Sequence, residues 1–276
     1  DQKAALGHRR LSIIDLSSGQ QPMATADGRL VIVFNGEIYN FPQLKKELQS
    51  LGHVFATNSD TEVILYSYAQ WGRECLSRLS GMFAFALWDR DRQQAFLARD
   101  RVGKKPLYYT WDGQTLAFAS ELKSLTAGGW SKKTIEPRAL DCFLTFGYVP
   151  SPLSIFQDVA KLQPAHALIA GRDGLDTFGY WSVSFARQQD LSLIDAGDQF
   201  QELLDQAVSS RLMSEVPLGA FLSGGLDSNL VVASMARAQD RPVLTNTIGF
   251  GAGEFDESPV AREAAQHLGT KHQEHA

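Results

Sequence analysis

The stretch Ser223-Gly224-Gly225-Leu226-Asp227-Ser228 decides how the second half of this chain folds. The apolar run 219–222 before it has the length of a buried strand, and residues 229–237 after it carry apolar side chains at helical spacing. The two glycines therefore lie in a turn between a strand and a helix. Such a turn lets the backbone approach a ligand closely, and the free N–H groups of the following helix favour an anion such as a phosphate.

The polar residues of the stretch extend this interpretation. Asp227 offers a carboxylate that could hold Mg²⁺ against a phosphate, and Ser223 and Ser228 offer hydroxyl donors. A purely structural turn is the alternative, but six positions fit a nucleotide site together. A Walker A loop is excluded, because Gly103-Lys104 is followed by Lys105-Pro106 and has no glycine five residues before it. The stretch resembles the pyrophosphate-binding loop of the N-type ATP pyrophosphatases, which cleave ATP between the α and β phosphates.

The residues after this loop continue the same pattern. A strand is predicted over 243–250 and a helix from Ser258, with Ser258 as N-cap and Pro259 at the first position. Alternating strands and helices indicate a parallel sheet, whose ligands bind at the carboxyl ends of its strands. Asp256 and Glu257 stand between this strand and helix, where they either belong to the site or only cap the helix.

The first half of the chain has a different pattern. Four strands are predicted over 82–88, 95–99, 107–110 and 116–120, with turns at 89–92 and at Asp112-Gly113. These are antiparallel hairpins, so the first half is expected to be α+β. Further strands are expected over 8–16, 30–34, 166–170 and 178–183, and a short apolar helix over 140–146.

Two polar segments of the first half allow a structural and a functional interpretation. Asn35-Gly36 is the commonest hairpin dipeptide, but Glu37 and a helix with Asn40 as N-cap follow almost at once. Ser59 and Glu62 have capping-box spacing. Asp60 lies between them, where it supports the helix dipole or binds the amine of a ligand.

The whole sequence limits the class of protein. With 276 residues, a net charge of -5 and no long basic run, it is not expected to bind nucleic acid. It contains no run of roughly 18 apolar residues and no signal peptide, which indicates a cytoplasmic protein without a membrane segment. Cys75 and Cys142 lack metal-ligand spacing and are expected to be reduced core residues.

Taken together, the segments resemble the glutamine-hydrolysing asparagine synthetases of the bacterial AsnB type, from about Leu6 to His275. The motifs that carry this resemblance are, in chain order, Gly7-His8-Arg9-Arg10-Leu11-Ser12-Ile13-Ile14-Asp15, Asn35-Gly36-Glu37-Ile38-Tyr39-Asn40, Ser59-Asp60-Thr61-Glu62, Gly81-Met82-Phe83-Ala84-Phe85-Ala86, Ala98-Arg99-Asp100-Arg101, Lys105-Pro106-Leu107-Tyr108-Tyr109, Ser120-Glu121 and the loop 223–228. Their order and spacing make the resemblance specific.

The resemblance implies two domains. Residues 1–186 would form an α+β glutamine amidotransferase domain with the N-terminal-nucleophile glutaminase fold, a sandwich of two antiparallel sheets between helices. Residues 187–276 would form the start of an α/β parallel-sheet ATP pyrophosphatase domain. The family's terminal nucleophilic cysteine and its downstream acidic motifs have no counterpart in this chain, so we expect it to be a fragment and inactive by itself.

The resemblance also implies site residues. Asn35 and Gly36 would form the oxyanion hole for glutamine, Arg10 would bind its α-carboxylate, and Glu37 and Asp60 would hold its α-ammonium group. Backbone near Leu11 and Ile13 would complete this pocket. In the second domain Ser223, Gly224, Gly225, Leu226, Asp227 and Ser228 would clamp the pyrophosphate of ATP, Asp227 would meet Mg²⁺, and Leu222 and Ile248 would flank the adenine or ribose.

The implied reaction is the ATP-dependent synthesis of asparagine from aspartate through β-aspartyl-AMP, with ammonia released from glutamine. Its cofactors are ATP and Mg²⁺, its partners are small molecules, and a homodimer is left open. One alternative is a related amidotransferase or β-lactam synthetase-like enzyme that adenylates another carboxylate. A non-catalytic regulatory or scaffold homologue is the other, against which the intact polar residues Arg10, Asn35, Glu37, Asp60 and Asp227 speak.

Overall fold

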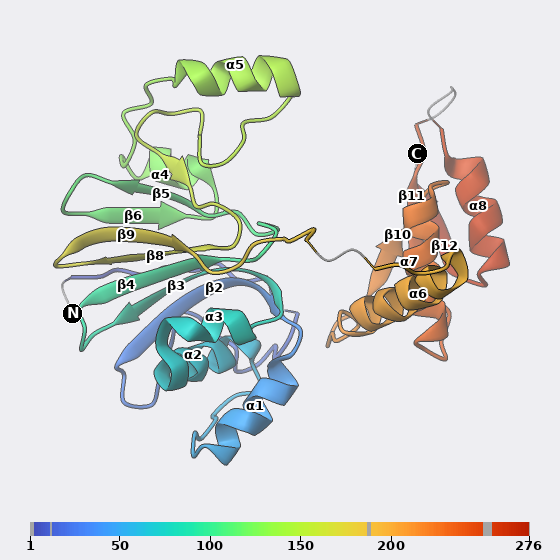
Figure 1. The fold of residues 1–276 in the computed structure, drawn as a ribbon, viewed down its shortest axis with the longest axis horizontal. Coiled ribbons are helices and arrows are strands. Elements are labelled where there is room, and N and C mark those ends of the chain that lie inside the picture. Colours follow the sequence, from blue (N-terminus) through green and yellow to red (C-terminus); the bar gives the residue numbers. More distant parts are fainter. Residues whose placement is uncertain (1–2, 12, 187–188, 251–255, 276) are drawn as a thin grey trace. The chain divides into compact units, whose positions relative to one another are not determined.

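The computed structural model describes residues 3–11, 13–186, 189–250 and 256–275. The chain divides into two compact units, Asp1–Ser184 and Phe185–Ala276 (Figure 1). None of the helices among the described residues is long and apolar enough to cross a membrane.

The first unit is built on a six-stranded sheet in the order β1-β2-β3-β4-β8-β9, in which every neighbouring pair is antiparallel. Its strands are β1 (Met23–Ala24), β2 (Leu30–Ile38), β3 (Gly81–Asp89), β4 (Gln94–Arg99), β8 (His166–Gly171) and β9 (Gly174–Gly179). A smaller antiparallel sheet has the order β6-β5-β7, with β5 (Tyr108–Trp111), β6 (Leu116–Ala119) and β7 (Ala160–Lys161). The predicted antiparallel hairpins are therefore confirmed.

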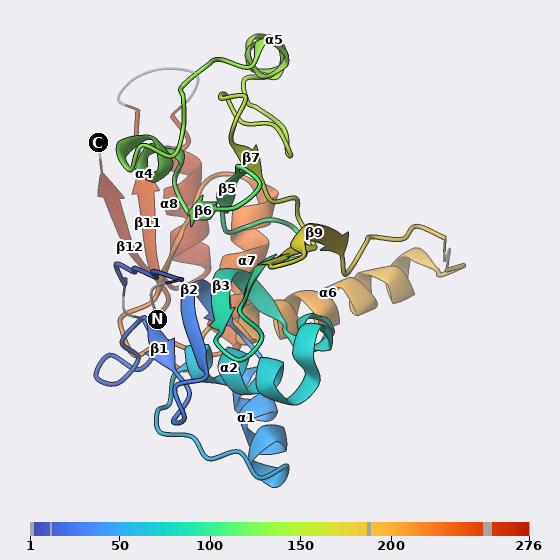
Figure 2. The same cartoon turned by 90° about the vertical axis from the view of Figure 1, so that its left-hand side faces the viewer.

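The large sheet lies between helices and the small sheet, as both views show (Figures 1 and 2). The covering helices are α1 (Phe41–Ser50), α2 (Asp60–Trp71) and α3 (Cys75–Arg78), with the 3-10 turn η1 (Gly72–Glu74) between the last two. Phe34 of β2 and Phe85 of β3 pack toward α1 and α2. Val33 and Ala84, one residue earlier on each strand, pack with Leu107 and Leu162 toward the small sheet. The alternation of the strands thus buries both faces of the sheet.

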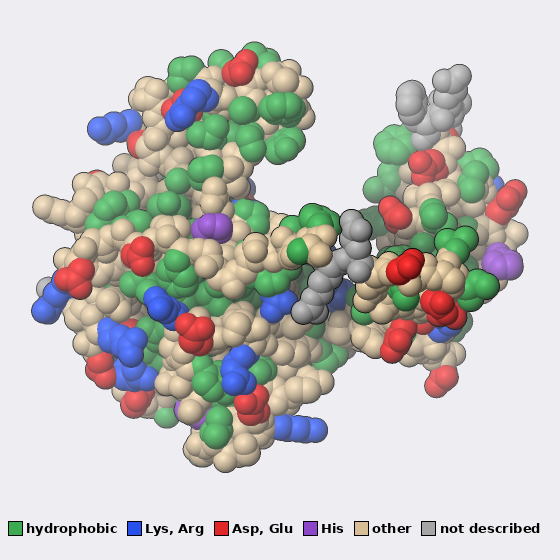
Figure 3. All heavy atoms as spheres, in the orientation of Figure 1, with side chains coloured by type: hydrophobic (Ala, Val, Ile, Leu, Met, Phe, Trp, Pro, Cys, Tyr) green, Lys and Arg blue, Asp and Glu red, His purple; other side chains and the backbone are tan. Residues whose placement is uncertain are grey.

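Two further helices belong to the first unit, α4 (Leu122–Ala127) and α5 (Pro137–Phe146). The predicted apolar helix at 140–146 is confirmed as part of α5, but Phe143 is 51% exposed and Leu144 is 75% exposed. Figure 3 shows hydrophobic side chains gathered on the surface over this helix. Only Ala139 of α5 is buried.

Four local expectations for the first half are not met, and three of them concern turns and strands. Asn35-Gly36 is not a turn, because β2 continues to Ile38 and pairs with β3 along its whole length. The described residues of 8–16 form no strand, and Ser12 lies outside the described residues. Asp15 has a φ of 52°, and Arg10 donates to the carbonyl oxygens of Ile14 and Asp15, so the segment turns instead of pairing. The strand expected over 178–183 lies earlier, as β9.

The fourth expectation that is not met is the capping box at Ser59 and Glu62. Ser59 is the N-cap of α2, and its Oγ accepts a hydrogen bond from Thr61 N at 3.2 Å. The Glu62 carboxylate does not accept a hydrogen bond from Ser59 N, as a capping box would require. Its carboxylate accepts instead from Ala56 N at 2.9 Å and from Thr57 N at 2.8 Å, because the preceding loop folds back over the helix end.

The second unit contains a parallel sheet in the order β10-β11-β12, as predicted. Its elements are α6 (Leu193–Ser209), β10 (Gly219–Phe221), α7 (Leu226–Arg237), β11 (Leu244–Ile248), α8 (Ser258–His267) and β12 (Lys271–His275). Its core includes Val208, Leu222, Val232 and Met235. Helix α8 begins at Ser258 with Glu257 as N-cap, one residue earlier than expected, because Asp256 Oδ1 accepts from Ser258 N at 3.1 Å.

A buried carboxylate organises the loop after β4. Asp100 is 1% exposed, and its oxygens accept hydrogen bonds from four backbone N–H groups. The donors and their distances are Phe83 at 3.2 Å, Val102 at 3.2 Å, Lys104 at 2.9 Å and Lys105 at 2.9 Å. This carboxylate therefore ties the loop 101–105 to strand β3.

We expect Asp100→Asn to lower the free energy of unfolding of the first unit by on the order of 3 kcal/mol, because an amide group would face buried donors. Asp112→Asn is the matched control, since Asp112 also accepts from two backbone N–H groups but is exposed, and should cost less than about 1 kcal/mol. Urea unfolding followed by tryptophan fluorescence measures the first unit alone, since all five tryptophans precede residue 185. Equal decreases in unfolding free energy for the two variants would contradict the role of Asp100 in tying the loop 101–105 to β3.

Candidate functional site

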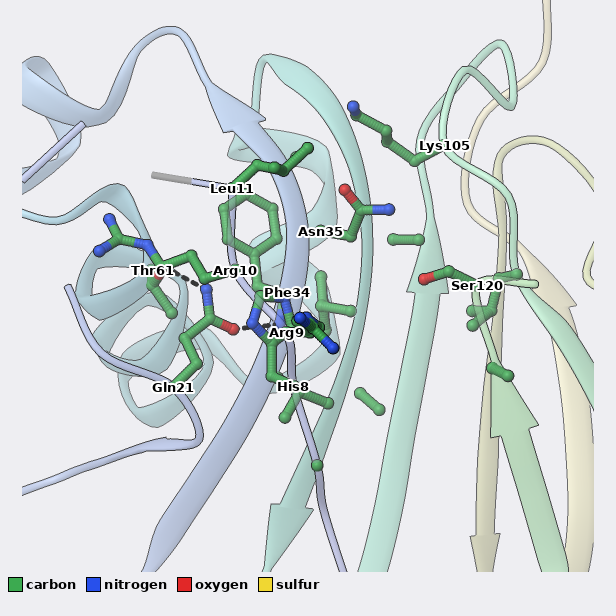
Figure 4. Close-up of a pocket in the computed structure, with 18 of the residues that line it drawn as sticks. His8, Arg9, Arg10, Leu11, Gln21, Phe34, Asn35, Thr61, Lys105 and Ser120 are labelled. Atoms are coloured by element: carbon green, nitrogen blue, oxygen red, sulfur yellow. Dashed lines mark hydrogen bonds between the residues drawn. The ribbon is translucent and has the colours of Figure 1, made fainter. Parts of the chain in front are cut away.

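A cavity of about 560 Å³ in the first unit brings together all the residues predicted to bind glutamine (Figure 4). Its lining includes Arg10, Leu11, Ile13, Asn35, Gly36, Glu37 and Asp60. They come from three separate parts of the chain, namely the described residues of 7–14 (7–11 and 13–14), strand β2 and the start of α2. We call this space the Asn35 cavity.

Strand β2 places Asn35 and Glu37 in the cavity because they follow Val33 at alternate positions on the face toward the small sheet. Gly36 lies between them with a φ of 156°. A Cβ atom there would collide with the carbonyl oxygen of Met82 and come within 2.8 Å of Phe83 Cα, so this position requires glycine. In Figure 4 the Asn35 carboxamide lies toward the side of the cavity that carries Lys105 and Ser120.

Two of the acidic side chains that line the cavity, Asp60 and Glu37, are partly or fully buried. Asp60, the first residue of α2, is 5% exposed, and its Oδ2 accepts a hydrogen bond from Ile38 N at 3.0 Å. Burial raises the pKa of Asp60 to about 6, against the hydrogen bond from Ile38 N–H, which lowers it. Burial also raises the pKa of Glu37, and the charge of Lys105 opposes this rise. Paired acids in a partly desolvated cavity are suited to a ligand ammonium group.

Arg10 reaches the cavity wall, but its guanidinium group already has partners. Nη1 donates to the carbonyl oxygen of Asp15 at 3.0 Å, and Nη2 donates to that of Ile14. Figure 4 shows Arg10 and Gln21 near Thr61, away from Lys105. A ligand carboxylate at Arg10 would therefore compete with, or bind beside, these carbonyl contacts. Leu11 also lines the cavity, and it is 92% exposed.

The sequence interpretation missed a role for Lys105. Its loop is held by Asp100 and by Arg99, whose guanidinium donates to the carbonyl oxygens of Lys105 at 2.7 Å, Leu162 at 2.6 Å and Gly103 at 2.8 Å. These contacts place Lys105 on the cavity wall, whereas the neighbouring Lys104 is exposed. The motif beginning at Lys105 was a signal for this site, but only the fold shows that its lysine lines the same cavity as Glu37 and that its charge acts to lower the pKa of that carboxyl.

Neither cysteine lies on the wall of the Asn35 cavity. Cys75 is completely buried, and desolvation raises the pKa of its thiol to about 12, so it is the core residue that was expected. Cys142 lies on α5 and is only partly buried, which differs from the prediction of a core residue. A thiol with so high a pKa as that of Cys75 is not a nucleophile at neutral pH.

The loop 222–225 of the second unit joins β10 to α7, where the sequence predicted it. Ser223 Oγ and Ser228 Oγ lie 2.9 Å apart, and Ser228 Oγ also accepts from Ser223 N at 3.2 Å. Asn229 Nδ2 donates to the carbonyl oxygen of Gly225 at 2.7 Å. Hydrogen bonds of these two serines and of Asn229 thus hold the conformation of the loop.

The N-terminus of α7 has the features of an anion site. Gly225 is its N-cap and provides no side-chain cap for the first-turn N–H groups. A Cβ atom on Gly224 would come within 3.1 Å of Val260 Cβ, so the loop packs closely against α8. Asp227 is exposed in the first turn of α7. These donors fit a phosphate group, with the Asp227 carboxylate beside it.

The two remaining residues predicted to border ATP, Leu222 and Ile248, differ in exposure. The Leu222 side chain is 2% exposed and packs in the core of the second unit, so only its backbone can contribute to a ligand site. Ile248 ends β11 and is 55% exposed. Among the described residues no group of three or more His, Cys, Asp or Glu side chains could hold a metal ion, so Asp227 offers Mg²⁺ a single carboxylate that would need phosphate oxygens as co-ligands.

The chain belongs to the glutamine amidotransferase domain family, whose model matches residues 1–181. A second family model, asparagine synthase, matches residues 199–276. The predicted fold class and the resemblance seen in the motifs are thereby confirmed.

Individual relatives agree with these two matches. Asparagine synthetase [glutamine-hydrolyzing] 3 of Bacillus subtilis is 38% identical over 283 residues, which cover 96% of this chain and 46% of that protein. A putative asparagine synthetase [glutamine-hydrolyzing] 2 of Methanocaldococcus jannaschii is 38% identical, covering 97% and 55%. Amidase chry2 of Gibberella zeae is 35% identical, covering 96% and 41%. The chain spans about half the length of the curated relatives it matches.

We expect Asp60→Asn to raise the stability of the first unit at pH 7 by on the order of 3 kcal/mol, since the pKa of Asp60 rises from 3.8 to about 6 and each pKa unit corresponds to about 1.4 kcal/mol. The folded-state pKa lies above the unfolded value, so the wild type binds more protons when folded and loses stability as the pH rises from about 4 to 6. The gain of the variant should therefore shrink toward pH 4.

Tryptophan-monitored urea unfolding at several pH values measures this difference. Asp173→Asn, which removes an exposed carboxylate, is the control and should leave the pH dependence unchanged. A variant that is less stable than the wild type at pH 7 would contradict the prediction.

Proposed function

We propose that this chain carries the glutamine site and the pyrophosphate loop of an enzyme that makes asparagine from aspartate. ATP would activate the β-carboxylate of aspartate as β-aspartyl-AMP, and ammonia from glutamine would displace AMP. The observation that supports this most directly is the convergence of seven residues from three segments on the Asn35 cavity, in a chain whose remainder matches the asparagine synthase model.

In the Asn35 cavity the proposed roles follow from the chemistry of each group. The Asn35 carboxamide and the Gly36 N–H would donate to the developing oxyanion of the substrate, and losing one such donor typically costs roughly 3 kcal/mol of transition-state stabilisation. Glu37 and Asp60 would hold the α-ammonium group, and Arg10 the α-carboxylate. We expect this chain to bind glutamine weakly and, since neither cysteine lies on the cavity wall, not to hydrolyse it.

In the second unit the loop 223–228 would hold the pyrophosphate part of ATP. The first-turn N–H groups of α7 and the loop backbone would donate to its oxygens, and the hydroxyls of Ser223 and Ser228 would add donors. Bound Mg²⁺ would neutralise phosphate charge, and Asp227 would hold it there. The Leu222 backbone and the Ile248 side chain would border the adenosine. ATP and Mg²⁺ are thus the proposed cofactors.

The acceptor is the least constrained part of the proposal. The similarity to amidase chry2 supports a second candidate, an amidotransferase that adenylates a carboxylate other than that of aspartate. We propose that the chain acts in the cytoplasm on small molecules. Its net charge of -5 supports the proposal that it does not bind nucleic acid. Dimerisation is left open.

We expect the wild type to bind L-glutamine, even if weakly, more tightly than glutaramic acid, which lacks the α-amino group. In Glu37→Gln this preference should fall by about tenfold, equivalent to about 1.4 kcal/mol, because one ammonium partner loses its charge. Titration followed by the NMR shifts of the Gly36 amide measures both affinities. Glu47→Gln, a change on the exposed face of α1, is the control. An unchanged preference in Glu37→Gln would refute the amine site.

We expect Asp227→Asn to weaken the binding of inorganic pyrophosphate in the presence of Mg²⁺ by about tenfold, or about 1.4 kcal/mol, because the loop would lose its metal-facing carboxylate. Without Mg²⁺ the same change should not weaken binding. Isothermal titration calorimetry measures both conditions, and Asp240→Asn, an exposed change after α7, serves as the control. Weaker binding only in the absence of Mg²⁺ would show that Asp227 has been misassigned.

A further inference from the structure

The backbone N–H groups of the loop 223–225 all have partners in this structure, and one partner differs from the others. Ser223 N donates to Ser228 Oγ at 3.2 Å, and Gly225 N donates to Ser223 Oγ at 3.2 Å. Gly224 N donates to Oε2 of Glu257 at 3.1 Å. Two of the acceptors are hydroxyls within the motif, whereas the third is a carboxylate oxygen from a residue more than thirty positions away.

A carboxylate at this N–H resembles the ligand that the loop is proposed to bind. Carboxylate and phosphate oxygens both accept charge-assisted hydrogen bonds from backbone N–H groups, with similar geometry. The Gly224 N–H cannot serve both well, so a phosphate oxygen that uses it has to displace Glu257. The side chain also brings a negative charge to the place where a pyrophosphate would add several more.

Glu257 is not held in this position by a need to cap α8. It is the N-cap residue of α8, but its side chain makes no capping hydrogen bond. Asp256 serves that end of the helix, with Oδ1 accepting from Ser258 N at 3.1 Å and from Ser258 Oγ at 2.7 Å. These hydrogen bonds lower the pKa of Asp256. The Glu257 carboxylate can therefore leave Gly224 without uncapping the helix.

The packing of α8 keeps Glu257 close to the loop. Val260, one turn into α8, contacts Gly224 so closely that a Cβ atom on the glycine would lie 3.1 Å from Val260 Cβ. The loop and the start of α8 thus form one contact region, with Asp227 on the α7 side and Glu257 on the α8 side. Both carboxylates would repel a metal-free pyrophosphate and would be offset by a divalent cation.

We propose that Glu257 occupies the phosphate position on the Gly224 N–H of the ligand-free loop, and thereby makes pyrophosphate binding depend on Mg²⁺. This inference rests on the pyrophosphate function proposed for the loop and adds a control of that function. Glu257 excludes anions that arrive without a cation. Pyrophosphate that carries Mg²⁺ displaces the carboxylate from Gly224 with less electrostatic opposition.

The test compares inorganic pyrophosphate binding to the wild type, Glu257→Ala and Glu257→Gln by isothermal titration calorimetry, with and without Mg²⁺. Without Mg²⁺, Glu257→Ala is expected to bind about tenfold more tightly than the wild type, and Glu257→Gln to lie between them. With saturating Mg²⁺ the difference should shrink to less than about threefold. Glu263→Ala removes an exposed carboxylate from the same helix and should behave as the wild type.

The outcomes separate the inference from the function on which it rests. If the wild type binds pyrophosphate but Glu257→Ala binds metal-free pyrophosphate no more tightly, the inference is overturned and the pyrophosphate loop stands. If neither protein binds pyrophosphate with or without Mg²⁺, the proposed loop function is overturned and the inference falls with it. The NMR shift of the Gly224 amide gives an independent check, since it should change in Glu257→Ala without ligand and respond to pyrophosphate in both proteins.

Discussion

The close approach of β2 and β3 is the constraint on which the Asn35 cavity depends. At Gly36 a Cβ atom would strike the carbonyl oxygen of Met82, and at Gly81 it would strike that of Glu37. Two glycines on paired strands therefore allow a backbone separation that other residues would prevent. The resulting register places Asn35 and Glu37 in the cavity and brings the Ile38 N–H to within 3.0 Å of Asp60 Oδ2.

The electrostatics of the cavity show a conflict between stability and binding. Burial raises the pKa of both Asp60 and Glu37, which means that the fold disfavours their ionised forms. The fold still retains both acids, as would be expected if a ligand cation stabilises them. Lys105 offsets part of the charge, and it does so because Asp100 ties its loop to β3 and Arg99 ties it to Leu162. Charges that are costly to bury commonly mark a binding site.

Local rules predicted the positions of elements better than the contacts of side chains. Asn40 stands at the N-cap of α1 as expected, but its side chain bridges the Arg78 carbonyl oxygen and the Ser80 N–H instead of capping the helix. Glu62 likewise serves the loop before α2. Asn40 bonds to residues about forty positions away, and Glu62 bonds to the loop just before its helix. In both residues the fold supplied a hydrogen-bond partner that replaced the one expected at the helix end. Asn35-Gly36 failed as a turn for the same reason, since pairing with β3 outweighed its turn preference.

The sequence by itself determined the two kinds of sheet, the hairpins at Asp89 and Asp112, the strand-loop-helix at 219–237 and the identity of the residues in the candidate sites. These features depend on local spacing, on turn chemistry or on motifs read in order along the chain. Only the tertiary structure decided that Lys105 shares a cavity with Glu37, that Arg10 is engaged by loop carbonyls, that the Leu222 side chain is buried and that Glu257 meets Gly224. Each of these depends on segments far apart in the chain or on burial, and no local pattern encodes which side chain a folded neighbour will bring within hydrogen-bonding distance.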